Sequence, residues 1–84
     1  MRIDKYLQVT RIIKRRVNAK EMLVQGRVLI NDKVAKPGTN VNIGDYIKLR
    51  FGNATLTIKV LDIRDKIKKE EVEELFEIIQ KESI

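Results

Sequence analysis

Apolar positions recur at helical spacing along the first third of the chain, and they predict two short helices. The first helix is expected from Asp4 to about Ile13. The pattern breaks near Lys14, and a second helix then runs to Gln25. Gly26 follows at the place where a left-handed C-terminal cap belongs. The N-terminal segment is therefore predicted to be a pair of helices that meet at a corner.

Short runs of alternating apolar and polar residues follow, and they predict β-strands. The Asn-Asp pair at residues 31–32 separates two such runs and predicts a tight hairpin, because both residues tolerate the positive φ angles of a type I′ turn. Residues 46–51 alternate strictly, and the Gly-Asn pair at residues 52–53 marks a second hairpin. The returning strand is expected over residues 55–63. These strands predict a small, mostly antiparallel sheet.

The C-terminal segment, from about Lys68, is predicted to be an amphipathic helix. Four apolar residues lie at i, i+3, i+4 and i+7, and glutamates occupy most of the other positions. The apolar stripe consists of Val72, Leu75, Phe76 and Ile79. We expect this stripe to pack on the rest of the domain, against Val17 and Val24. Docking of a protein partner on the stripe is the alternative.

Together these elements predict an α+β fold. Residues 1–64 are expected to form one domain, in which the two short helices pack on the sheet. Residues 65–84 are expected to form the acidic amphipathic helix, packed on that domain. A chain of 84 residues suits a single small core.

Basic charge is concentrated at the N-terminal end of the chain. The 18 Lys and Arg residues outnumber the 12 Asp and Glu residues, for a formal net charge of +6. Residues 1–36 hold ten basic and three acidic residues, a net charge of +7, whereas residues 37–84 hold eight and nine, a net charge of −1. The densest basic cluster is Lys14-Arg15-Arg16, at the predicted corner between the helices. This asymmetry favours a polyanionic partner over a merely solvated surface.

The composition also excludes several kinds of chemistry. The chain has no Cys and no His, so no disulfide, thiolate nucleophile or Cys/His zinc site is expected. Its acidic residues show no paired or metal-spaced arrangement, and we expect no catalytic residue, metal or cofactor. The longest uncharged runs are 8 residues, too short to span a membrane, and the N-terminus does not have the pattern of a signal peptide. We therefore expect a cytoplasmic monomer that does not bind membranes.

One set of residues within positions 1–51 has the order and spacing of a known domain family. These residues are Arg2, Ile3, Asp4, Lys5, Tyr6, Leu7, Arg11, Arg15, Arg16, Ala19, Gln25, Gly26, Val28, Ile30, Asn31, Val34, Lys36, Pro37, Gly44 and Asp45. The set resembles the S-four RNA-binding domain, also called the alpha-L motif. Within that family, the chain is similar to the small stand-alone members that associate with ribosomes, a group that includes the fifteen-kilodalton heat-shock protein.

This resemblance implies a function and a set of binding residues. Such members bind the rRNA of a large ribosomal subunit that carries an obstructed peptidyl-tRNA, and some assist a partner that adds a C-terminal tail to the stalled nascent chain. The residues implied to contact RNA are Arg2, Asp4, Lys5, Arg11, Lys14, Arg15, Arg16, Lys20 and Lys36. Asp4 is unusual on such a surface. It would either orient Arg2 or Arg16, bond a base or ribose, or serve only as an N-terminal helix acid.

Other functions compete with this interpretation. A general rRNA-binding factor, structural or active in ribosome assembly, would carry the same basic surface. Two short helices with Arg15 and Arg16 at their corner would also suit a helix-turn-helix protein that binds DNA. An enzyme is the weakest alternative, because no catalytic arrangement accompanies the basic residues.

Overall fold

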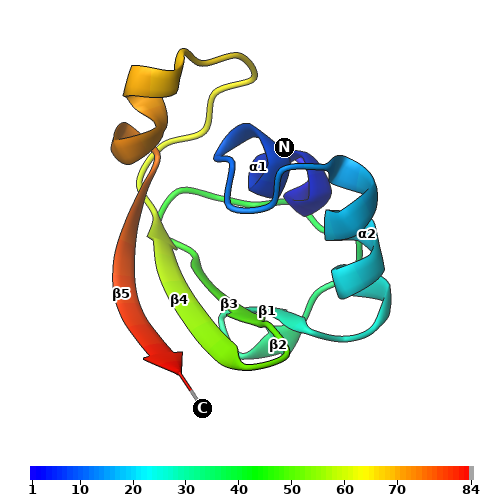
Figure 1. The fold of residues 1–84 in the computed structure, drawn as a ribbon. Helices are drawn as coiled ribbons and strands as arrows, with labels where there is room; N and C mark the ends of the chain where they lie inside the picture. The colour runs from blue at the N-terminus through cyan, green and yellow to red at the C-terminus, as the bar shows by residue number, and fades with distance from the viewer. Residues whose placement is uncertain (84) are drawn as a thin grey trace.

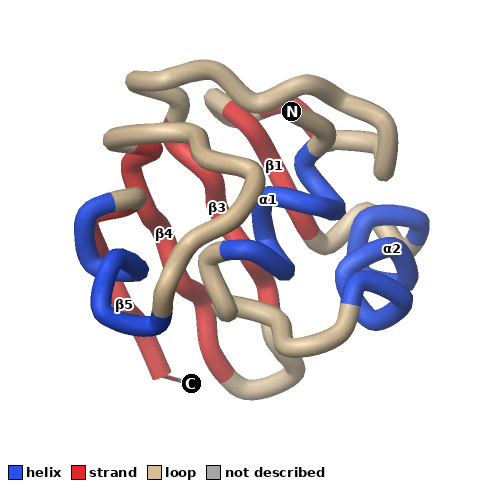
Figure 2. Tube along the Cα trace, turned by 90° about the horizontal axis from the view of Figure 1, so that it is seen from above, coloured by secondary structure: helices blue, strands red, loops and turns tan. Residues whose placement is uncertain are grey.

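The computed structural model describes residues 1–83 and combines two short helices with one antiparallel sheet (Figure 1). The strands lie in the order β2-β1-β3-β4-β5. Along the chain the elements are α1 (Ile3–Val9), α2 (Arg16–Val24), β1 (Val28–Ile30), β2 (Lys33–Val34), β3 (Tyr46–Arg50), β4 (Ala54–Val60), the 3-10 helix η1 (Lys69–Glu74) and β5 (Phe76–Ser83). Seen from above, α2 and η1 lie at opposite ends of the row of strands, with α1 between them (Figure 2). The expected α+β fold of two helices on an antiparallel sheet is confirmed.

The first helix ends earlier than its apolar pattern predicted. Thr10 turns its hydroxyl back to donate a 2.8 Å hydrogen bond to the Tyr6 carbonyl, which competes with continuation of the helix. Arg11 then adopts a left-handed conformation with φ of 62°, which ends α1 well before Ile13. The second helix has nearly the predicted bounds, and Gly26 follows it with φ of 73°, as expected for its cap.

The turn signals in the sequence are confirmed by the backbone. Asn31 and Asp32 have φ angles of 49° and 68°, the positive values required by a type I′ turn, and they connect β1 to β2. The predicted hairpin at residues 52–53 connects β3 to β4. Its register pairs Ile47 with Ile58, so apolar side chains from both strands face the helices.

The hydrophobic core lies between this face of the sheet and the helices. Strand residues Ile47, Leu49 and Ile58 are fully buried, and so are Tyr6 and Leu7 of α1. Outward-facing residues of β3 alternate with the buried ones, which leaves the opposite face of the sheet polar and open to solvent. α1 is therefore held against the sheet along its apolar side, and its polar side is available for binding.

The prediction of a C-terminal amphipathic helix is wrong. Only Lys69–Glu74 is helical, as a short 3-10 helix, and Phe76–Ser83 forms β5. β5 pairs with β4 from Phe76 opposite Val60 to Ser83 opposite Ala54, so the segment completes the sheet of the same domain. Val17 and Val24, the expected packing partners of the helix, remain 59% and 76% exposed.

The physical reason for this error is that helical spacing does not exclude a strand. A helix would have left the seven-residue strand β4 as an unprotected sheet edge, with one side of its backbone unpaired. Pairing with β5 satisfies that edge, and a β-bulge between Thr57 and Ile58 absorbs the irregular register. Helix propensity is a weak preference that tertiary strand pairing overrides.

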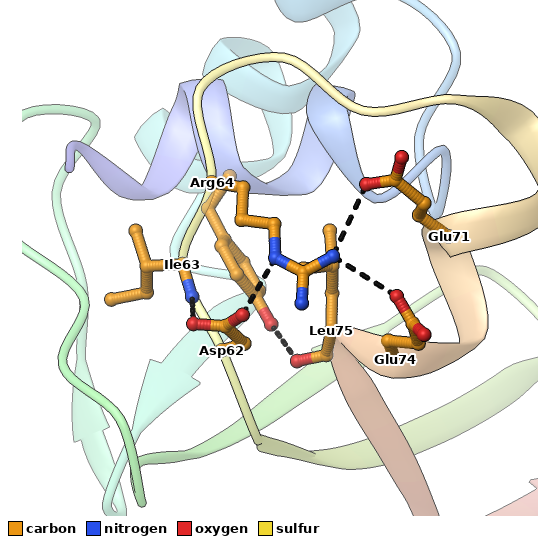
Figure 3. A network of polar contacts seen from close by, with 7 residues as sticks. Asp62, Ile63, Arg64, Glu71, Glu74 and Leu75 are labelled. Carbon is orange, nitrogen blue, oxygen red and sulfur yellow. Dashed lines mark hydrogen bonds and ion pairs between the residues drawn. The ribbon is translucent and has the colours of Figure 1, made fainter.

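The backbone carbonyl of Leu75 ties the end of η1 to α1 and to the loop before η1 (Figure 3). It accepts hydrogen bonds from the Tyr6 hydroxyl at 2.8 Å and from the backbone N–H groups of Leu61 and Asp62 at 2.8 and 3.2 Å. Burial, assisted by the nearby Asp62 charge, raises the pKa of Tyr6, so its hydroxyl stays a donor. The loop over residues 61–68 is therefore held beside α1.

Arg64 holds the same loop to η1. Its guanidinium donates to Asp62 at 2.7 Å, to Glu71 at 3.1 Å and to Glu74 at 3.0 Å (Figure 3). The hydrogen bonds that Arg64 donates to Glu74 and Asp62 raise the pKa of Arg64. The hydrogen bonds that Asp62 accepts from the Ile63 N–H and from Arg64 lower the pKa of Asp62. Two glutamates of the expected amphipathic helix, Glu71 and Glu74, instead accept hydrogen bonds from this arginine.

None of the helices in residues 1–83 is both long enough and apolar enough to cross a lipid bilayer.

Candidate nucleic-acid interface

A buried carboxylate organises the N-terminal end of α1. The Asp4 side chain is 0% exposed and accepts hydrogen bonds from Arg2 Nη2 at 3.2 Å and from Arg16 Nη2 at 3.4 Å. The backbone N–H of Lys5 donates at 2.8 Å to Asp4 Oδ1, the oxygen that also accepts from Arg16, whereas Arg2 donates to Oδ2. We call Arg2, Asp4 and Arg16 the arginine cluster. It joins the start of α1 to the start of α2, two points that are 12 residues apart in the sequence.

The start of α1 is held in place by the loop over residues 36–41. Arg2 forms an isolated β-bridge with Asn40, and the Ile3 N–H donates to the Thr39 carbonyl at 2.8 Å. Val41 is buried, and its N–H donates to the Met1 carbonyl at 2.9 Å. The backbone on both sides of Arg2 is thus anchored, which limits how far its guanidinium can move.

Opposing effects set the ionisation of Asp4. Burial raises the pKa of this carboxyl, but the hydrogen bond and charge of Arg16, the Lys5 N–H and the charge of Arg2 together lower it below its usual value. Asp4 is therefore ionised at neutral pH. One negative charge faces two positive ones, and the two arginine side chains remain 50% and 40% exposed. The cluster keeps a net positive charge on two guanidinium groups that are partly open to solvent, which suits a phosphate.

Lowering the pH is expected to reduce the free energy of unfolding through protonation of Asp4. The pKa of Asp4 in the folded protein lies below its value of about 3.9 in the unfolded chain. Ionised Asp4 therefore adds to the free energy of unfolding above a pH of about 3.9, and this contribution is lost as the pH falls through the folded-state pKa. We expect the free energy of unfolding of Asp4→Asn to be about 1–3 kcal/mol below wild type at pH 7. Urea titrations at pH 7 and between pH 5 and 2 test this. The difference between the two proteins should shrink toward pH 2, and a constant difference would contradict it.

A second group of basic residues lines a hollow at the other end of α1. This hollow has a volume of about 500 Å³ and lies between α1 and the loop over residues 61–68. We call it the α1 groove; its lining residues are Gln8, Val9, Arg11, Lys14, Asp65, Lys66 and Ile67. Lys5 Nζ lies 2.9 Å from Asp65 and, by hydrogen bond and charge, lowers the pKa of that carboxyl.

The structure thus divides the nine residues expected to contact RNA. Arg2, Asp4 and Arg16 meet in the arginine cluster, and Arg11 and Lys14 share the α1 groove. Lys5 is paired with Asp65 at the edge of that groove. The other three residues are exposed and belong to neither group: Arg15, Lys20 and Lys36.

Arg15 and Arg11 occupy backbone positions that favour other residue types. Arg15 is the N-cap of α2, yet its side chain forms no capping hydrogen bond, so the helix forgoes about 1 kcal/mol that Ser or Asp would supply there. Arg11 has a positive φ at a position where glycine is usual. In both places a basic side chain replaces the residue that the backbone would favour.

Lys66 was missed by the sequence analysis. Lys66 lies in residues 37–84, whose net charge is −1, so the acidic residues of that half cancel its positive charge in the total. A local signal was present, because three lysines fall within residues 66–69. Across residues 1–83, no group of three or more acidic side chains is placed to hold a metal ion.

Comparison with known proteins adds four findings. The S4 domain family model matches residues 1–47. An RQC P-site tRNA stabilizing factor of Streptococcus pneumoniae is 48% identical over 79 residues, which cover 94% of this chain and 90% of that one. The protein of the same name from Bacillus subtilis is 43% identical over 84 residues, which cover 100% and 98%. A trimeric structure of Vibrio cholerae Heat Shock Protein 15 is similar with a TM-score of 0.85 and 35% identity, over 93% of this chain and 80% of that one.

Proposed function

The chain belongs to the S4 domain family, and we propose on that basis that it is an RNA-binding factor that stabilises peptidyl-tRNA on stalled large ribosomal subunits. The observation that carries this proposal is 43–48% identity, over nearly the whole chain, to proteins named RQC P-site tRNA stabilizing factor. The arginine cluster supplies the surface that such a factor needs. In this role the chain supports quality control, in which a stalled nascent chain receives a C-terminal tail.

The proposed mechanism requires binding and positioning only. The guanidinium groups of Arg2 and Arg16, held by Asp4, present planar donors that match phosphate oxygens. The sequence has only two Tyr and two Phe, and Tyr6, the aromatic residue of α1, is fully buried, so recognition depends on the shape and backbone of folded RNA rather than on base stacking. The names of the relatives describe stabilising factors rather than enzymes, and no reaction step is needed here.

The finer parts of the proposal concern partners and assembly. We propose that the chain acts in the cytoplasm, contacts both rRNA and peptidyl-tRNA, and works beside a factor that tails the nascent chain. We propose that it does so as a monomer. Vibrio cholerae Heat Shock Protein 15, by contrast, is described as trimeric. Light scattering after size-exclusion chromatography measures the molar mass in solution and tests whether this chain is a monomer.

Cosedimentation tests the function. Large subunits that carry peptidyl-tRNA should retain the chain at moderate salt, whereas vacant large subunits should retain much less of it. If six to eight phosphates are contacted, log K should fall with log salt with a slope on the order of −5 to −7. Absence of the chain from peptidyl-tRNA-bearing subunits would overturn the proposal. Equal retention on every large subunit would instead indicate a structural or assembly factor.

A further inference from the structure

We infer that the α1 groove is a second contact for an RNA sugar–phosphate backbone, in which Arg11, Lys14 and Lys66 neutralise phosphates that the arginine cluster does not reach. The inference rests on the proposed function and extends it to a part of the chain outside the N-terminal motif. Lys66 comes from the segment after β4, beyond residues 1–47 that match the family model.

The charge of the α1 groove favours an anion. Its lining contains three cations and one carboxylate, and that carboxylate belongs to Asp65, which is already paired with Lys5. Arg11, Lys14 and Lys66 form no ion pair with any residue in the described part of the chain. Three positive charges therefore converge on one concave surface, a geometry that concentrates phosphate groups.

The backbone at Arg11 supports the same conclusion. With φ of 62°, this residue has a conformation in which a Cβ atom is strained and glycine is the usual choice. Its N–H donates to the Gln8 carbonyl at 3.0 Å, which closes the end of α1 as glycine would. An arginine at this position therefore weakens the turn and contributes a guanidinium to the groove.

The opposite wall of the α1 groove is held in place before any ligand arrives. The Leu75 carbonyl binds both Tyr6 of α1 and the backbone at residues 61–62, and Arg64 joins the same loop to η1 (Figure 3). Lys66 follows directly after this anchored stretch, so its backbone cannot swing far from α1. A loop whose backbone is already in place loses less conformational entropy when a ligand binds.

RNA suits the groove better than an acidic protein segment does. Three of the seven lining residues are cations, and Val9 and Ile67 are the two apolar ones, so positive charge is the main feature that a partner can match, and a phosphate backbone supplies negative charge at every nucleotide. The groove and the arginine cluster also lie at the two ends of α1, a helix of seven residues and therefore about 10 Å long. One folded RNA can span both.

The test compares Lys66→Gln with the matched control Lys81→Gln, on the exposed end of β5. The probe is large ribosomal subunits that carry peptidyl-tRNA, titrated with the chain at several salt concentrations. We expect Lys66→Gln to weaken binding about three- to tenfold and to make the salt slope shallower by about one. Lys81→Gln should match wild type in both measurements.

A second variant separates binding from stability. Arg11→Gly removes the guanidinium and also relieves the backbone, so the melting temperature should rise by a few degrees while the affinity falls. Loss of affinity in a protein that melts later cannot come from unfolding. Wild-type affinity and salt slope in both Lys66→Gln and Arg11→Gly would overturn the inference.

Crosslinking identifies the occupant. Because the chain has no cysteine, Gln8→Cys gives a single attachment point in the groove for a benzophenone. Adducts with RNA on the bound subunit support the inference, and adducts with protein alone overturn it in favour of an acidic protein segment. If the groove variants bind like wild type while Arg16→Gln fails to bind, only the groove is excluded. If wild type itself does not bind the subunits, the proposed function fails and the groove contact fails with it.

Discussion

Replacing Arg16 with glutamine is expected to lower the affinity of the chain for large ribosomal subunits that carry peptidyl-tRNA by about 10- to 100-fold. A hydrogen bond to a charged group contributes about 1.5–3 kcal/mol, and Arg16 supplies both a donor fork and a unit charge. Its guanidinium is already oriented by Asp4, so little entropy is lost when a phosphate binds. Titration of labelled chain with purified subunits measures this change directly.

Folding should survive the substitution, which makes the result interpretable. Asp4 retains Arg2 and the Lys5 N–H as partners, so the free energy of unfolding should fall by only about 1 kcal/mol. Arg50→Gln is the matched control, because Arg50 is exposed on β3 and alternates with residues that face the helices. Equal affinity of the two variants would show that the arginine cluster is not the contact surface. If Arg16→Gln melts early, Arg2→Gln repeats the test with a more exposed side chain.

Leu75→Ala is expected to destabilise the protein by about 2–5 kcal/mol. The Leu75 side chain is fully buried, and its carbonyl lies where η1, α1 and the loop over residues 61–68 meet. Domains of this size are stable by about 4–13 kcal/mol, at 0.05–0.15 kcal/mol per residue. The substitution should therefore remove a large share of the total stability. Urea denaturation followed by circular dichroism measures the difference.

The control for this prediction is Ile79→Ala, which also tests the C-terminal strand. In the amphipathic helix expected from the sequence, Leu75 and Ile79 lie four residues apart on one buried stripe, and their truncations would cost similar amounts. In the structure Ile79 belongs to β5 and is 47% exposed. Its truncation should cost less than about 1 kcal/mol. Similar losses for the two variants would contradict the β5 arrangement.

Much of the fold could be predicted because its signals are local. The Asn-Asp turn at residues 31–32 and the cap at Gly26 depend on what one or two residues tolerate in φ, and both are present in the structure. The spacing of apolar residues also identified α2 closely. The end of α1 was harder, because Thr10 and Arg11 stop the helix through a side-chain hydrogen bond and a left-handed turn that the apolar pattern does not reveal.

The candidate site was predicted in its composition but not in its arrangement. The concentration of basic residues near the N-terminus is visible in the sequence alone, and so is the oddity of Asp4 among them. That Asp4 is buried, and that it holds both Arg2 and Arg16, depends on where α2 begins in space relative to α1. The sequence left this role open beside that of an ordinary helix acid.

By itself, the sequence determined the two helices, the hairpins, the family and the positive charge of the surface that we propose binds RNA. These features depend on residue type and on spacing over a few positions, where short-range sterics and charge act. Only the tertiary structure decided that the C-terminal segment is a strand and that Lys66 lines the same groove as Arg11. Both depend on contacts between distant parts of the chain. β5 forms because the edge of β4 would otherwise be unpaired. Lys66 lies at the groove because the Leu75 carbonyl and η1 hold its loop beside α1.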